Sequence, residues 1–472
     1  MSRARIIAKN AGFLLLSQII TFIFSFLFIV YTARYLGVEG YGTLSFAIAF
    51  TGILSVFTDL GLSVWVTREV TRDMSLARKY LGNIMAIKIV LAVFSFGLIS
   101  VIINLLNYPL ETINLVYLIA FYFIISSFTN LFYAIFQSHE QMEYQSYGQI
   151  LNSALLFLGA VFLIFNQLNI INFGFLYLTV SLILLGYAFL VCAWKFFYPK
   201  IEIDLSFWKP TLKEAWPLSV AVIFSMIYFK VDVVLLSLLK GNSVVGWYVA
   251  SYNILEFLLV IPAIFTTSIY PFFSQVHVTS PQSLQQSYEK SFKYLLILGL
   301  PISVGITILA DKIIFLIYGT AFQNAVISLQ ILIWTIPLIF LTYLLRFLLI
   351  SMNKQVLVLK IIFICMTFNI VLNLLLIPQF SYLATAAMTV FTELLLFVLC
   401  FYYTSTLIDK IRTKFVVKPI FASGVMGFFL VYFNFELFIS ILIGIIIYLI
   451  FLIILKTFSK EDIDLFKELI NK

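Results

Sequence analysis

The chain has 472 residues, of which 63% are hydrophobic and only 11% are charged. A water-soluble fold of this length could not hydrate so much apolar surface, which excludes soluble enzymes and soluble binding modules. The composition therefore predicts an all-α integral membrane protein.

Fourteen apolar stretches follow one another along the chain. A helix that crosses the bilayer needs roughly 17 to 25 apolar residues, because backbone groups in lipid must be satisfied within the helix. The first stretch is too long for a signal peptide and lacks a small-x-small cleavage site, so we expect it to be retained. The predicted spans lie near 11–32, 43–66, 84–106, 113–136, 147–165, 173–196, 216–239, 248–273, 293–309, 326–350, 356–377, 384–406, 416–433 and 437–455.

The basic residues alternate from one side of these spans to the other. The amino-terminal tail, every second connection and the carboxyl-terminal tail together hold 22 of the 29 Lys and Arg residues. The opposite connections hold three, Arg34, Lys240 and Lys312. Cytoplasmic loops carry the basic excess, so we expect a multi-pass protein of the cytoplasmic membrane with both termini in the cytoplasm. The net charge of +8 then follows from topology, and no nucleic-acid partner is predicted.

A repeat at an offset of 204 residues suggests duplication. Gly37 and Gly42 recur as Gly241 and Gly246, and spans one and seven begin at about the same offset. We expect two six-helix lobes, 1–200 and 201–410, related by a pseudo-two-fold axis along the membrane normal. The connection 197–215 would be their hinge, and 411–472 would add a helix pair and a cytoplasmic tail. From Ser459 onward that tail fits either an amphipathic interfacial helix or a solvated segment.

Ionisable residues inside the spans are costly and need a reason. Lys88 and Lys360 lie near cytoplasmic ends and could extend to the headgroups. Lys230 and Asp232 lie deeper and diverge by about 200° on a helix, so at least one should face a polar cavity or another helix. Arg346 has a planar fork suited to phosphate, whereas its position near the cytoplasmic end also fits a headgroup anchor.

The remaining candidates have two interpretations each. Arg34 could bind substrate or anchor the outer end of span one. Asp59, Glu256 and Glu393 could couple a cation, balance charge or serve packing, because burial favours a protonated carboxyl. Asn369 and Asn373, on one helix face, fit helix–helix hydrogen bonds as well as substrate contacts.

Signals for other chemistry are missing from the sequence. Cys192, Cys365 and Cys400 lie inside spans and form no disulfide or metal pattern. There is no phosphate-binding Gly-rich loop, and no nucleophile–base or paired-carboxylate arrangement stands out. We therefore expect no catalytic residues, no metal and no cofactor, and transport driven by a gradient or by the substrate's own disequilibrium.

Several motifs carry a resemblance to a known family. They are Arg34-x-Leu36-Gly37 with Tyr41-Gly42, and Asp59-x-Gly61-Leu62 leading to Arg68-Glu69. The second half adds Asp232, Gly241, Gly246, Tyr248, Ala250, Pro271, Ser274, Tyr318-Gly319, Ala325, Asn373 and Pro378. In their order and spacing these resemble the polysaccharide-transport flippases of the multidrug/oligosaccharidyl-lipid/polysaccharide (MOP) exporter superfamily. One departure is that Ser381 and Ala384 follow Pro378, where the family commonly has glycines.

The resemblance implies a flippase that moves a polyprenyl-(pyro)phosphate-linked oligosaccharide to the outer leaflet by alternating access. A cationic cavity would take the head while the tail stays in lipid, with possible proton or Na⁺ coupling and a monomeric state. On this hypothesis Arg34, Lys230 and Arg346 hold phosphate, and Asp59, Asp232, Glu256 and Glu393 couple a cation or balance charge.

Two alternatives remain. A cation-coupled drug antiporter of the same superfamily would share the fold but need a carboxylate-dominated cavity. A membrane-embedded polysaccharide polymerase or ligase would be an enzyme, and we expect it to show a sizeable basic external loop, which this chain lacks.

Overall fold

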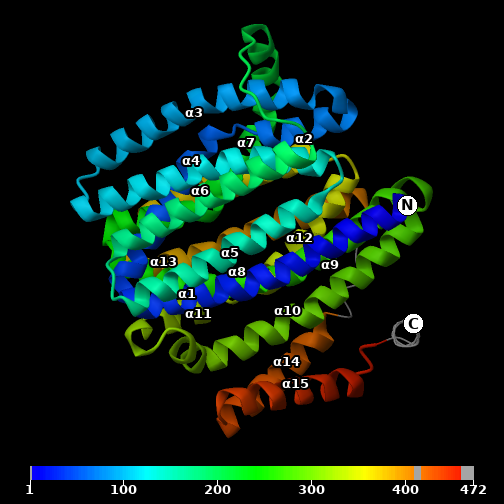
Figure 1. Ribbon diagram of the computed structural model, residues 1–472. Helices are drawn as coiled ribbons and strands as arrows, with labels where there is room; N and C mark the ends of the chain where they lie inside the picture. Colours follow the sequence, from blue (N-terminus) through cyan, green and yellow to red (C-terminus); the bar gives the residue numbers. More distant parts are fainter. Residues whose placement is uncertain (1–2, 409–415, 459–472) are drawn as a thin grey trace. The chain divides into compact units, whose positions relative to one another are not determined.

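The computed structural model describes residues 3–408 and 416–458, and these are helical almost throughout (Figure 1). Eleven helices in this part of the chain are long and apolar enough to cross a membrane. Two of them, Ser17–Thr58 and Gln355–Leu407, each overlap two predicted spans, and Val417–Phe433 is a shorter apolar helix. The predicted all-α membrane fold with fourteen spans is therefore confirmed.

The two longest helices each contain a break between two predicted spans. Helix α1 (Arg3–Ser55) is broken at Gly37, with φ 66° and ψ −175°. Helix α13 (Gln355–Leu407) is broken at Ser381, with φ 55° and ψ −142°. This backbone region is nearly restricted to glycine, so Ser381 is strained where Gly37 is not. The departure noticed in the sequence therefore coincides with an unfavourable turn.

The chain divides into two compact units, Met1–Gly246 and Trp247–Lys472. The first contains α1 and six further helices: α2 (Leu62–Arg72), α3 (Ala77–Leu105), α4 (Leu110–Ser138), α5 (Met142–Phe165), α6 (Ile170–Lys195) and α7 (Leu205–Lys240). Helix α4 packs between α3 and α6 and also contacts α1 and α2 (Figure 1). Its residues Leu115, Ile119, Leu131 and Ile135 are fully buried. Helix α4 is thus the centre of this unit.

The start of α7 is attached to α2 and α3. The rings of Trp65, Tyr80 and Phe207 lie 5.3 to 5.8 Å apart and join the three helices. The backbone N–H of Asp204 donates to Asn83 Oδ1 at 2.8 Å, and Lys79 pairs with the Asp204 carboxylate at 3.3 Å. These contacts, with the packing of α7 on α1 and α2, place α7 in the first compact unit. The repeat boundary at 200/201 and the hinge role of 197–215 remain predictions.

The two glycine-containing segments of the predicted repeat, 37–42 and 241–246, meet inside the first unit. A Cβ added to Gly42 would lie 1.8 Å from the carbonyl oxygen of Asn242, and one added to Gly246 would lie 2.1 Å from that of Val38. Residues 38 and 242 are themselves 204 positions apart, so the contact is reciprocal. Such reciprocity is what a local two-fold axis produces. Only glycine fits at either position without displacing the facing backbone.

The second unit contains the rest of α8 (Asn242–Leu258) and seven more helices. They are α9 (Val260–Thr279), α10 (Pro281–Ile317), α11 (Ala325–Leu332), α12 (Thr335–Ser351), α13, α14 (Val417–Phe433) and α15 (Leu437–Ile454). Helix α12 packs on α9, α10 and α13. Its residues Ile336, Phe340, Leu344 and Leu348 follow one another at helical spacing and are fully buried.

The structure corrects one span and leaves two sequence features outside its range. The span predicted at 43–66 is not one helix, because the chain leaves helical geometry between Ser55 and Leu62. Leu60 and Gly61 both have positive φ, 44° and 71°. The basic connection with Lys410, Arg412 and Lys414, and the tail from Ser459, lie outside the described residues.

Candidate functional site

Four of the seven predicted site residues belong to the first unit. Arg34 is exposed on α1, one turn before the break at Gly37. Lys230 and Asp232 both lie on α7, which is continuous through them. Asp232 is only 5% exposed, while Lys230 is half-buried, as expected for side chains on different faces of one helix. Whether either lines a substrate path remains a prediction.

Asp59, the fourth, lies in the break between α1 and α2. Its carboxylate forms an ion pair with Lys88 of α3 and accepts a hydrogen bond from Ser63 Oγ at 2.5 Å. The Lys88 side chain is completely buried, whereas that of Asp59 is 29% exposed. The expectation that Lys88 extends to the headgroups is therefore wrong. Its partner lies 29 positions earlier in the sequence, so its distance from the end of its own span did not reveal the pair.

Two predicted residues approach each other in the second unit. Arg346 of α12 and Glu393 of α13 both exert their charge on Tyr343, Cys365 and Cys400, which places them in one neighbourhood. Glu393 is 5% exposed and Arg346 is half-buried. The Arg346 Nε is buried and has no hydrogen-bond partner among the described residues. An unmet donor of this kind is costly in a dry environment, and a bound anion would satisfy it.

Glu256, the last predicted site residue, belongs to α8. It is half-buried and acts electrostatically on Tyr318, whose hydroxyl is hydrogen-bonded to Asn253. Nearer to Glu393, Asn373 Nδ2 donates to Asn369 Oδ1 at 3.1 Å, and Asn369 Nδ2 donates to Thr392 Oγ1 at 3.4 Å. The asparagines therefore join the two halves of α13, as the helix–helix interpretation predicted.

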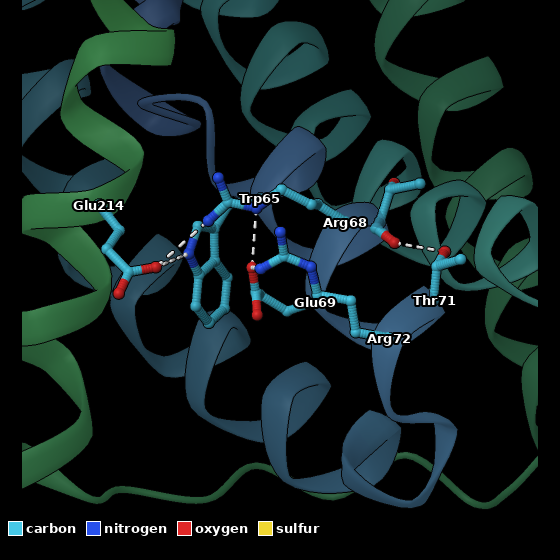
Figure 2. Close-up of polar contacts among 7 residues, drawn as sticks. Trp65, Arg68, Glu69, Thr71, Arg72 and Glu214 are labelled. Carbon is cyan, nitrogen blue, oxygen red and sulfur yellow. Dashed lines mark hydrogen bonds and ion pairs between the residues drawn. The ribbon is translucent and has the colours of Figure 1, made fainter.

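A charged network that the sequence did not single out joins α2 to α7 (Figure 2). Glu214 Oε2 accepts from Trp65 Nε1 at 3.0 Å and from Arg68 at 3.2 Å. Glu69 Oε1 accepts from Arg68 Nε at 2.7 Å and from Arg72 at 3.0 Å. Trp65 is only 4% exposed, so Glu214 satisfies a buried donor. The i, i+3 spacing of Glu69 and Arg72 was the signal in the sequence for part of this network. The contribution of Glu214 could not be predicted from spacing.

The carboxylate that caps the start of α7 has a lowered pKa. Asp204 lies in the connection before α7, and its side chain accepts from the Ser206 backbone N–H at 3.1 Å as an amino-terminal cap. The hydrogen bond from the Ser206 hydroxyl, followed by the one from Lys79, holds the pKa of Asp204 below its usual value. The ion pair between Lys79 and Asp204 is therefore present when this carboxyl is ionised.

An apolar groove lies in the second unit between α10, α14 and α15. Its volume is about 440 Å³, and its lining includes Ile297, Pro301, Gly305, Met426, Gly444 and Tyr448. The Tyr448 hydroxyl already donates to the Ile297 carbonyl at 2.8 Å. The groove thus offers no cation or free donor to an anionic head and suits only apolar chains.

The fold matches solved structures of membrane transporters. "Lipid II flippase MurJ, inward closed conformation" aligns with TM-score 0.76 and 16% identity, covering 92% of this chain and 97% of that one. An inward-facing multidrug resistance MATE family transporter of the MOP superfamily gives 0.67 and 12%, covering 82% and 94%. A MOP superfamily transporter from Pyrococcus furiosus, described as having a binding pocket of reversed polarity, gives 0.55 and 12%, covering 84% and 92%. No curated protein matches the chain significantly in sequence.

These matches, at 12 to 16% identity, show the fold. The family models, with the apolar helices, define the class, a multi-pass membrane transporter or flippase of the MOP superfamily. The model described as "Polysaccharide biosynthesis protein" matches residues 7–277, and the MatE model matches 217–375. Since the first covers more than half of the 472 residues, the chain belongs to that polysaccharide biosynthesis family.

Proposed function

We propose that this protein moves a polyprenyl-(pyro)phosphate-linked oligosaccharide from the cytoplasmic to the outer leaflet of the cytoplasmic membrane, for assembly of a surface polysaccharide. The single observation that carries the proposal is the buried Nε of Arg346, which has no hydrogen-bond partner in the part of the chain that the structure describes, in a member of a polysaccharide biosynthesis family. An anionic, sugar-bearing head cannot cross bare hydrocarbon without losing its hydration at great cost. A guanidinium with an unmet donor can replace part of that hydration.

The proposed division of roles follows the chemistry of each residue. Arg346, Lys230 and Arg34 contact phosphate, while Asp232, Glu256 and Glu393 balance charge or couple a proton or Na⁺. The protein acts as a monomer, with both termini in the cytoplasm, and carries out transport rather than an enzymatic reaction. The structural relative named as a lipid II flippase supports a lipid-linked substrate.

Drug antiport is the competing function, because a family model and several structural relatives belong to drug transporters. A cationic drug would be repelled by Arg346 unless Glu393 or another carboxylate outweighed that charge. The buried unmet donor of Arg346 favours an anionic substrate.

The experiment reconstitutes the protein in liposomes with a labelled polyprenyl-pyrophosphate oligosaccharide and measures how fast the head becomes accessible on the far side. Arg346→Gln should slow this about 10- to 100-fold, because a hydrogen bond to a charged group is worth about 1.5–3 kcal/mol. Lys360→Gln, at an exposed cation on α13, is the matched control and should not alter the rate. Equal rates for both variants would remove Arg346 from the site.

A further inference from the structure

The break between α1 and α2 places a carboxylate within an interrupted helix. After Ser55 the chain forms one 3₁₀ turn, Val56–Thr58, and re-enters helix at Leu62 only through the positive-φ residues Leu60 and Gly61. Asp59 is at the centre of this interruption. Transporters commonly place cation sites at interrupted helices, where carbonyls and a carboxylate can converge.

The position that a cation would take is filled by the Lys88 ammonium. Its Nζ pairs with Asp59 and donates to the Ser127 carbonyl at 2.7 Å, Ser127 Oγ at 2.8 Å and Ser63 Oγ at 3.2 Å. The surroundings are thus one carboxylate, one backbone carbonyl and two hydroxyls. These hard oxygen ligands are of the type that binds small cations without a transition metal.

The ammonium comes from a helix that does not contain the break. Lys88 lies on α3, Ser127 on α4 and Ser63 at the start of α2, while Asp59 lies within the break. The positive charge is thus fixed to the chain and fully withdrawn from solvent. Asp59 keeps 29% of its side-chain surface. Solvent can therefore reach the carboxylate, but its charge is already neutralised and its neighbouring oxygen ligands are already occupied by the ammonium.

We propose that Lys88 is a tethered substitute for a monovalent cation, and that Asp59 consequently takes up neither Na⁺ nor another small cation from solution. This assigns Asp59 to charge balance rather than to ion coupling, and leaves any coupling to carboxylates elsewhere in the chain. The inference builds on the proposed transport function. Its tests measure cation binding, so they keep their meaning if the substrate proposal fails.

The first test removes the tethered cation. Purified Lys88→Ala protein is melted in Na⁺, in NH₄⁺ or in the bulky cation N-methylglucamine at equal ionic strength. A ligand that binds only the folded state raises the melting temperature, so we expect a rise of about 2 °C or more in Na⁺ and in NH₄⁺. The wild type should not show this rise, and Lys88→Ala with Asp59→Asn should lose it. An equal response in all three proteins would overturn the proposal.

A second measurement covers the case in which Lys88→Ala does not fold. The double variant Asp59→Asn with Lys88→Met removes both charges and leaves no buried ion uncompensated. The proposal expects the wild type and this double variant to respond identically to Na⁺ in the same melting assay. A larger Na⁺ response in the wild type would mean that Asp59 binds the ion beside Lys88, and the proposal would be wrong.

Discussion

Lys88 in the first unit and Arg346 in the second are both cations within apolar helices, but their surroundings differ. The Lys88 ammonium has an ion pair and three further oxygens around it. The Arg346 Nε is buried without a partner among the described residues. A cation whose donors are satisfied by the protein contributes to structure, whereas one with an unmet donor can bind an anionic ligand. Burial of charge alone therefore does not mark a substrate site.

The largest expected effect is a difference in the free energy of unfolding between substitutions of these two cations. Lys88→Met leaves Asp59 without its counter-ion, and breaking a buried pair costs about 3–5 kcal/mol. Arg346→Met removes an unsatisfied donor and should cost far less. Chemical denaturation in detergent compares them. Equal losses for both variants would abolish the distinction between a structural and a ligand-binding cation.

The next effect tests the close contact between Gly42 and the backbone of Asn242 in the first unit. Gly42→Ala places a methyl group 1.8 Å from the Asn242 carbonyl, and overpacking of this kind costs about 1–3 kcal/mol. Gly97→Ala is the control, because nothing lies within 4 Å of its added Cβ and alanine favours helix. We expect the first substitution to lower the melting temperature and the second to leave it or raise it slightly. An unchanged melting temperature for Gly42→Ala would mean that segments 37–42 and 241–246 are not in close contact.

Within the same unit, Glu214→Ala leaves the buried Trp65 indole N–H without its acceptor. The expected loss is about 1 kcal/mol, since an unmet buried donor costs about 1–3 kcal/mol and water can reach the exposed carboxylate position. Glu214→Gln keeps an acceptor and should retain most of the stability. Tryptophan fluorescence during denaturation measures the stability of both variants. A loss of stability that is larger for Glu214→Gln than for Glu214→Ala would refute the role of this hydrogen bond.

The smallest effect belongs to the second unit and is a gain. Ser381→Gly relieves a backbone conformation that costs about 1–3 kcal/mol for a residue other than glycine, less about 0.5–1 kcal/mol of added chain entropy. We expect stability to rise by about 1 kcal/mol. Gly37→Ser is the reciprocal variant in α1 and should lower stability. A Ser381→Gly variant that is less stable than the wild type would contradict the strain at this turn.

The sequence predicted the membrane fold well because apolar length and glycine turns are local properties. Fourteen apolar windows gave the helices, and Gly37 and Gly241 marked breaks that the structure places at positive φ. The Lys88–Asp59 pair was missed because it joins residues on different helices, and Asp59-x-Gly61 could not by itself reveal the interrupted span. Arg346 was a candidate from its chemistry, but its unmet Nε depends on packing that no spacing encodes.

The most direct test of the account compares flipping of three polyprenyl oligosaccharides by the reconstituted protein, with a pyrophosphate, a monophosphate or no phosphate between lipid and sugar. If Arg346 recognises an anionic head, the wild-type rate falls in that order, and Arg346→Gln reduces the difference between the charged and uncharged substrates. Equal wild-type rates for all three, or transport of cationic dyes alone, would contradict the proposed function.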